Sequence, residues 1–136
     1  MLQTGLLGRL EQQHQARSLL IVCGAGTSLH ASEDPRAGWW GFLDHAIEWC
    51  EAGNISLGGG DGIDRARGDL QAGDLISVAD KVQRGLEEAG DWTRFLLETV
   101  GALAVVDPSV PRLLGRLRAP IAVSYTHLTL PTTPYV

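Results

Sequence analysis

An apolar run that ends on two closely spaced glycines constrains the fold of this chain more than any other feature. Residues 19–23 read LLIVC, without a polar position, and Gly24-Ala25-Gly26 follows at once. A short apolar run that includes β-branched residues is typical of a strand buried on both sides. Such strands belong to parallel sheets covered by helices, so the run predicts an α/β fold.

The rest of the chain is dominated by patterns typical of helices. A polar loop is expected over residues 29–38, with Asp74 and Asp91 as N-caps of later helices and a second strand at residues 120–122. Strand, tight glycine turn, several helices and a second strand are the opening of a doubly wound, Rossmann-like fold. With only two parallel strands, the fold is expected to be mostly helical and incomplete. Helices are predicted at about 1–17, 39–53, 62–71, 73–89 and 91–105, with a short one within 107–120.

Composition sets the broad class. The chain has 136 residues, 44 % of them hydrophobic, and a formal net charge of −5. The acidic balance argues against a nucleic-acid partner, because phosphate contacts need clustered Lys and Arg. The longest apolar stretches, residues 19–23 and 100–106, are too short to span a membrane, so no membrane partner and a cytoplasmic location are expected. The two cysteines, Cys23 and Cys50, cannot form a four-ligand zinc site.

The chemistry is concentrated at the glycine turn. Gly24 permits a tight turn, and Gly26 leaves room for a pyrophosphate to approach the backbone N–H groups. The hydroxyl groups of Thr27 and Ser28 can donate to phosphate or ribose oxygens, so Gly24, Ala25, Gly26, Thr27 and Ser28 are the candidate cofactor-binding residues. The dinucleotide fingerprint would have a third glycine where this chain has Leu29. A second interpretation is that the glycines only turn the chain.

Other polar and aromatic residues have plainer interpretations. His30 follows the glycine turn, but a lone loop histidine more often makes a local contact than binds a ligand. Asp34 and Arg36 flank Pro35 and predict a local turn with an ion pair. His45 and Glu48 lie three apart on a predicted helix, as many solvated pairs do. The tryptophans at 39, 40 and 49 are predicted to anchor the core.

The context of the glycine turn resembles a known family. LLIVCGAGTS, a loop with Trp39-Trp40 and then FLDHAIEWC resemble the start of a sirtuin-like domain of the bacterial, NAD-consuming kind that is associated with anti-phage defence. The segments DLISVADKV and LLGRLRAPIA extend the resemblance over residues 15–122. It implies that Gly24–Ser28 hold the pyrophosphate of NAD, with the chain serving as the N-terminal fragment of the NAD-binding domain. The oligomeric state is left open.

The chain departs from the family after residue 122. There the family carries Thr-Thr-Asn-Tyr-Asp, whose asparagine cleaves the nicotinamide–ribose bond together with a downstream histidine. This chain has Val123-Ser124-Tyr125-Thr126-His127. Three hypotheses follow: a fragment of an NAD-consuming enzyme, a hydrolase rather than a deacylase; a non-catalytic module that senses NAD or ADP-ribose; or a small helical interaction domain without a ligand. We assign no catalytic residue and no metal ligand to this chain.

The last residues differ in composition from everything before them. Residues 123–136 hold no charge and no glycine, yet they hold both tyrosines and four of the eight threonines. VSYTHLTLPT resembles an in-frame translation of the transposase adapter used to prepare sequencing libraries. We therefore expect a native segment over residues 1–122 and a non-native tail over 123–136. A strand with a threonine-rich end, or a disordered terminus, is the alternative.

The sequence predicts that this polypeptide does not cleave NAD. Without the family's asparagine and histidine, nothing positions a water molecule or acts as general base, and NAD affinity is expected to be weak or absent. Incubation of the purified protein with NAD should leave free nicotinamide at the level of a protein-free control. Nicotinamide that accumulates in proportion to protein concentration would contradict this.

Overall fold

A computed structural model describes residues 2–123 of the chain, and the tail predicted from residue 123 onward falls outside it except for Val123. The elements follow the order helix, strand, helices and strand, with a 3-10 turn η1 (Pro35–Ala37) among them. None of the described helices has both the length and the apolar character needed to cross a membrane. The described residues form seven α-helices, which are α1 (Leu2–Gln15), α2 (Ala25–Ser32), α3 (Trp39–Ala52), α4 (Gly62–Gln71), α5 (Leu75–Glu88), α6 (Trp92–Thr99) and α7 (Ser109–Leu117).

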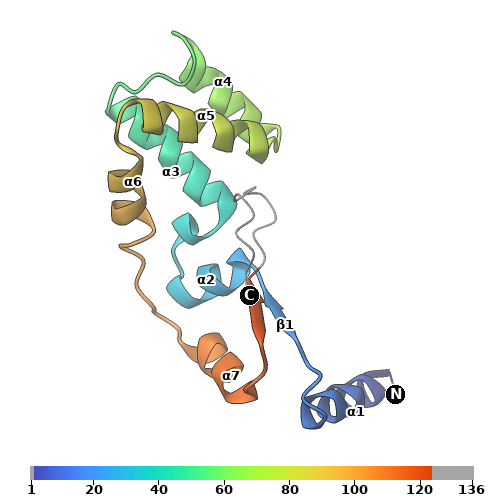
Figure 1. Cartoon of the computed structure of the whole chain (residues 1–136). Helices are drawn as coiled ribbons and strands as arrows, with labels where there is room; N and C mark the ends of the chain where they lie inside the picture. Colours follow the sequence, from blue (N-terminus) through green and yellow to red (C-terminus); the bar gives the residue numbers. More distant parts are fainter. Residues whose placement is uncertain (1, 124–136) are drawn as a thin grey trace.

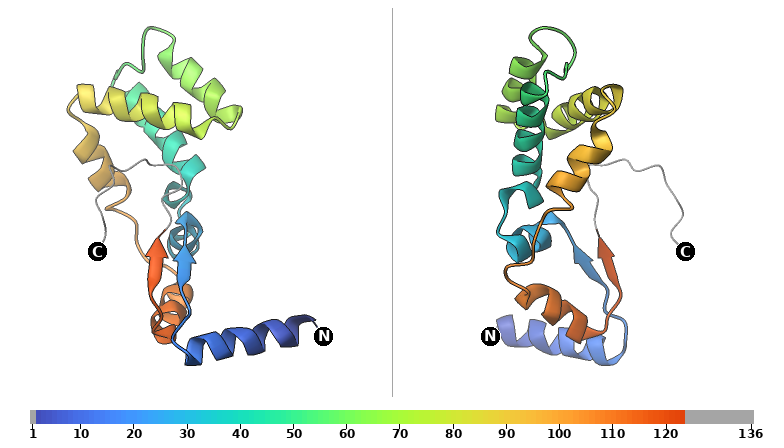
Figure 2. Two further views of the ribbon diagram at one scale, coloured as in Figure 1. Left: turned by 45° about the vertical axis from the view of Figure 1, so that its right-hand side comes forward. Right: turned by 90° about the vertical axis from the view of Figure 1, so that its left-hand side faces the viewer.

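Two short strands form a parallel pair, as the sequence predicts. β1 (Ile21–Cys23) lies beside β2 (Ile121–Val123), and Ile21 is the partner of Ile121 in the register. The two arrows run side by side in both views of Figure 2. The described part of the chain is therefore α/β in the coarse sense, mostly helical with two parallel strands.

The prediction that the first strand is buried on both sides is wrong. Leu20 is 59 % exposed and Val22 is 65 % exposed. Side chains alternate along a strand, so these two share one face, and Ile21 and Cys23 share the other, which is half-buried. Two strands with helices on one side leave the second face open to solvent in the part of the chain that the structure describes. The apolar run indicated the strand but could not reveal how few neighbours it has.

The hydrophobic core lies among the helices and not against the sheet. On α3 the buried residues are Leu43, Ala46, Ile47 and Cys50, whose spacing of three and four residues places them on one face. Figure 1 shows α4 and α5 packed across this helix and α6 along its side. The core is completed by Leu57, Ala66, Leu70, Val78, Val82, Leu86 and Phe95.

Helix ends agree with the sequence in part. Asp74 caps α5 as predicted, because its Oδ1 accepts from the N–H of Ser77 at 3.1 Å. Asp91 precedes α6 as predicted, but its carboxylate accepts from Trp49 Nε1 at 2.7 Å and pairs with Arg94 instead of capping. The last predicted long helix ends at Thr99, six residues early, where Gly101 and then two valines disfavour a helix.

The region after β1 differs most from expectation. The predicted glycine turn and the first residues of the predicted polar loop form one helix, α2, which starts directly after Gly24. The loop contracts to residues 33–34, the η1 turn and Gly38. Glycine and serine lower helix propensity, so the sequence pattern hid the helix. Packing stabilises the helix, because Ala31 is buried. The carbonyl oxygen of Ala31 accepts hydrogen bonds from the N–H groups of Val106 and Asp107 at 2.8 and 2.9 Å.

A glycine in α5 provides a test of the helical core. A Cβ added at Gly85 would lie 2.7 Å from both the carbonyl oxygen of Ser56 and a methyl group of Leu57. Gly85→Ala should therefore destabilise the protein by about 1–3 kcal/mol, because the backbone of the 55–57 segment must shift. The matched change Gly68→Ala meets nothing within 4 Å and should stabilise α4 by about 0.5–1 kcal/mol. Urea unfolding of both variants measures the two changes in the free energy of unfolding. Changes of the same sign and size would contradict the packing described.

Candidate functional site

The predicted nucleotide-binding residues lie where β1 meets α2. Gly24 is the N-cap of α2, and Ala25, Gly26 and Thr27 form its first turn. The N–H of Thr27 donates to the carbonyl of Gly24 at 3.1 Å. The first N–H groups of any α-helix lack a carbonyl partner within the helix, and here they belong to Ala25 and Gly26. The junction therefore presents partial positive charge at the carboxyl end of the strand.

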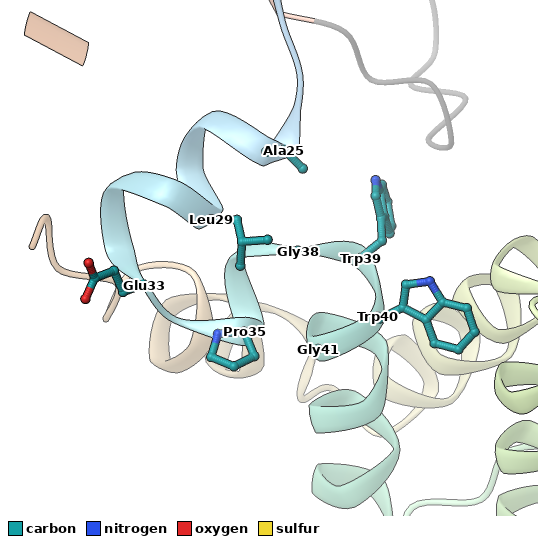
Figure 3. Close-up of a pocket in the computed structure, with 9 residues that line it drawn as sticks. Ala25, Leu29, Glu33, Pro35, Gly38, Trp39, Trp40 and Gly41 are labelled. Carbon is teal, nitrogen blue, oxygen red and sulfur yellow. The ribbon is translucent and has the colours of Figure 1, made fainter. Parts of the chain in front are cut away.

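The N-terminus of α2 opens into a pocket of about 570 Å³. Figure 3 shows the side chains of Ala25 and Leu29 on one side of the opening and that of Trp39 on the other. Of the five predicted site residues, Ala25 and Gly26 line this pocket, whereas Gly24, Thr27 and Ser28 do not. The pocket is lined by Ala25, Gly26, Leu29, Glu33, Pro35, Gly38, Trp39, Trp40 and Gly41.

A tight turn between α2 and α3 sets the floor of the pocket. Asp34 Oδ1 accepts from the backbone N–H of Arg36 at 2.9 Å, and the Arg36 guanidinium lies 2.6 Å from Asp34 Oδ2. These hydrogen bonds from Arg36 lower the pKa of Asp34 to about 2. Gly41 completes the turn, because a Cβ there would lie 2.1 Å from the carbonyl oxygen of Pro35. The local turn with an ion pair is confirmed.

The role expected for Gly24 as a flexible turn residue is wrong. Its φ of −114° and ψ of −171° are extended backbone, which any residue can adopt. A Cβ added at Gly24 or at Gly26 would meet nothing within 4 Å. Neither glycine is therefore required by the fold that the structure describes. What both provide is unobstructed access to the backbone at the start of α2.

The tryptophans divide into two groups. Trp49 packs its ring 5.5 Å from the ring of Phe95 and under the guanidinium of Arg94, as predicted for a core anchor. Trp40 is 52 % exposed and stands at the pocket, so its predicted core role is wrong. This difference could not be predicted from the sequence, because both residues belong to one apolar helical pattern.

The histidines and cysteines among the described residues do not line the pocket. His30 lies in the last turn of α2 and is exposed, and its Nδ1 is 3.9 Å from Oδ2 of Asp107, so its contact is with a residue far along the chain and not the local one expected. His45 stacks on Phe95, with ring centroids 6.0 Å apart, and its Nδ1 is 4.0 Å from Glu48. Cys50 is buried, and burial together with Asp91 raises the pKa of its thiol to about 11, so it stays protonated. Cys23 is half-buried and free.

The charge at the pocket is sparse. Glu33 is the ionisable residue among those that line it, and no lysine or arginine is among them in the described part of the chain. A bound anion would be held by backbone N–H groups and the dipole of an eight-residue helix. Comparison with protein-family models, with curated proteins and with solved structures found no match.

The ion pair in the turn predicts the titration of Asp34. Its carboxyl should show a midpoint near pH 2 in an NMR titration, and Arg36→Gln should move it back toward the ordinary value of about 3.8. Because the folded-state pKa lies below the unfolded one, Asp34 stabilises the fold above about pH 3.8. That contribution is lost as the pH falls toward 2. An unchanged midpoint in the Arg36→Gln protein would contradict this account.

Proposed function

We propose that residues 24–41 form the nucleotide-binding element of a sirtuin-like, NAD-consuming domain. The observation that carries the proposal is the position of the start of α2. Ala25 and Gly26, predicted from the sequence to hold a pyrophosphate, line the same pocket as Trp39 and Trp40. A site for a dinucleotide needs both an anion-binding backbone and an apolar surface for a ring, and the pocket offers both.

The pyrophosphate belongs at the N-terminus of α2. The N–H groups of Ala25 and Gly26 are the donors available to phosphate oxygens, and the helix dipole favours negative charge there. The space around the Cα atoms of Gly24 and Gly26 is open, so a phosphate can approach the backbone without a side chain in its way. Thr27 is half-buried, Ser28 is exposed, and neither lines the pocket. Their hydroxyl groups can therefore contact only a part of the ligand that extends outside it.

An aromatic ring of the ligand belongs against the tryptophans. A pocket of about 570 Å³ is within the usual size of small-molecule sites, roughly 300–1,000 Å³. Trp39, Leu29 and Pro35 supply the apolar walls, and the exposed indole of Trp40 stands at the rim. Such a surface suits a planar heterocycle, which both ends of NAD provide.

Binding through this element alone is weak. Among the described residues no lysine or arginine lines the pocket, so the two negative charges of the pyrophosphate would be stabilised only by the backbone N–H groups and the dipole of α2. Solvent partly screens this interaction. We expect a dissociation constant in roughly the millimolar range. The described residues are assigned binding and orientation of NAD. Cleavage of the nicotinamide–ribose bond, by hydrolysis in preference to deacylation, is assigned to the parent domain, whose asparagine and histidine this chain does not carry.

A titration that uses the tryptophans as reporters tests the proposal. NAD and ADP-ribose should each quench the fluorescence at the pocket in a saturable way, and Gly26→Asp should abolish the effect. The new carboxylate would repel phosphate, yet it would favour the fold, because an acidic side chain in the first turn of a helix is stabilising by about 0.3–1 kcal/mol. Loss of binding would then not reflect unfolding.

The matched control is Gly8→Asp in α1. It makes the same charge change on an exposed helix, at a position where a Cβ meets nothing within 4 Å. Its titration should match that of the unmodified protein, and circular dichroism should show both variants folded. Equal quenching in the Gly26→Asp protein, or no saturable quenching by either nucleotide in the unmodified protein, would exclude a nucleotide site at α2.

A further inference from the structure

The charges of this chain are separated between its two ends. Residues 2–23 and 108–123, which form α1, α7 and both strands, carry five arginines and one acidic residue, a net charge of +4. We call them the basic end. Residues 24–107 carry six basic and fifteen acidic residues, a net charge of −9, and are called the acidic body. Figure 1 shows α1 and α7 at one end of the molecule and α4 and α5 at the other.

Ion pairing differs in the same way. Each of the six basic residues in the acidic body pairs with a carboxylate, which leaves nine acidic residues in surplus there. The arginines of the basic end make no ion pair with any residue that the structure describes. The pairs of the acidic body are Arg36–Asp34, Arg65–Asp61, Arg67–Glu51, Lys81–Asp69, Arg84–Asp80 and Arg94–Asp91.

Local structure accounts for only part of the basic end. Arg17 and Arg118 follow the C-termini of α1 and α7, where a positive side chain interacts favourably with the helix dipole. The two helix ends meet, since His14 Nε2 lies 2.6 Å from the carbonyl oxygen of Leu117. Arg112 and Arg116 are four residues apart on α7 and so share a face, and Arg9 lies within α1. Arg116 also lies in the last turn of α7, where its charge interacts favourably with the helix dipole, so Arg9 and Arg112 are the two arginines without such a local role.

Apolar side chains accompany the arginines. Leu6 and Leu7 of α1 are each 61 % exposed, Leu10 is 45 % exposed and Leu113 of α7 is 57 % exposed. A helix of fourteen residues with two internal glycines is marginal by itself, so α1 needs an apolar surface to pack against. Exposed leucines beside cations resemble the apolar centre and charged rim of a protein interface.

We propose that the basic end docks on the acidic body of a second copy of this chain, in an antiparallel dimer. The complement that the basic end requires is present in the acidic body of the same molecule, where nine carboxylates have no lysine or arginine partner. Two such contacts related by a two-fold axis close the assembly and use both charged ends of both copies. An anionic membrane or a nucleic acid fits less well, because the acidic body would be repelled and α1 itself carries the acidic residue Glu11.

Sedimentation equilibrium at low and high ionic strength tests the dimer. The full chain should associate at about 0.05 M salt and dissociate at about 0.5 M, because screening weakens charge pairing. Arg112→Glu/Arg116→Glu should weaken the dimer at low salt by roughly tenfold or more. Both positions are exposed, so circular dichroism should remain that of the unmodified protein.

The control reverses two arginines of the acidic body. Arg65→Glu/Arg84→Glu makes the same change in net charge at two exposed residues, but it makes the acidic body more negative. The dimer should be unchanged or tighter in this variant. Equal weakening by both variants overturns the proposal, as does a monomer at both salt concentrations or association that grows with salt. Association of the chain with anionic vesicles or single-stranded DNA in preference to itself also overturns it.

Discussion

The apolar face of α3 is the interaction on which the remaining structure depends. Its buried residues hold α4, α5 and α6, and through Phe95 they connect to the aromatic cluster around Trp49. The same helix begins at Trp39, at the edge of the pocket, and Gly41 allows the η1 turn to sit against it. One helix therefore serves the core with most of its length and the candidate site with its first turn.

The sequence was informative wherever a local pattern decides the structure. The face of α3, the cap at Asp74, the ion pair in the η1 turn and the two parallel strands all follow from spacing or residue type. It failed where long-range packing decides. Nothing local distinguishes Trp40, at the pocket, from Trp49, in the core, and the burial of β1 depends on how many elements surround it. The helical state of α2 was hidden by glycine and serine, whose low propensity is overridden at a helix N-terminus packed against its neighbours.

The residues predicted to hold a pyrophosphate lie together where β1 meets α2, but they form the start of a helix and not a tight turn. Ala25 and Gly26 lie at a strand–helix junction and line a pocket, which a phosphate-binding turn requires. The glycines do not produce a tight turn there, since Gly24 has extended backbone. The rest of the pocket comes from the segment that follows α2, and Leu29, Glu33 and Pro35 carried no signal of their own. A Rossmann-like arrangement and NAD as the ligand stay predictions.

The register of the two strands has a kinetic consequence. Ile21 and Ile121 pair although they are one hundred positions apart in the sequence, and the pairing covers only three residues on each strand. Closing so long a loop for so little contact is entropically costly, so the strands should join only after the helical body has formed. The start of α2, at the end of β1, would then be the last part of the candidate site to become ordered and the first to open. A ligand that contacts both α2 and the first turn of α3 would stabilise the closed state of this junction. It would therefore slow the exchange of amide protons in β1 more than in α3.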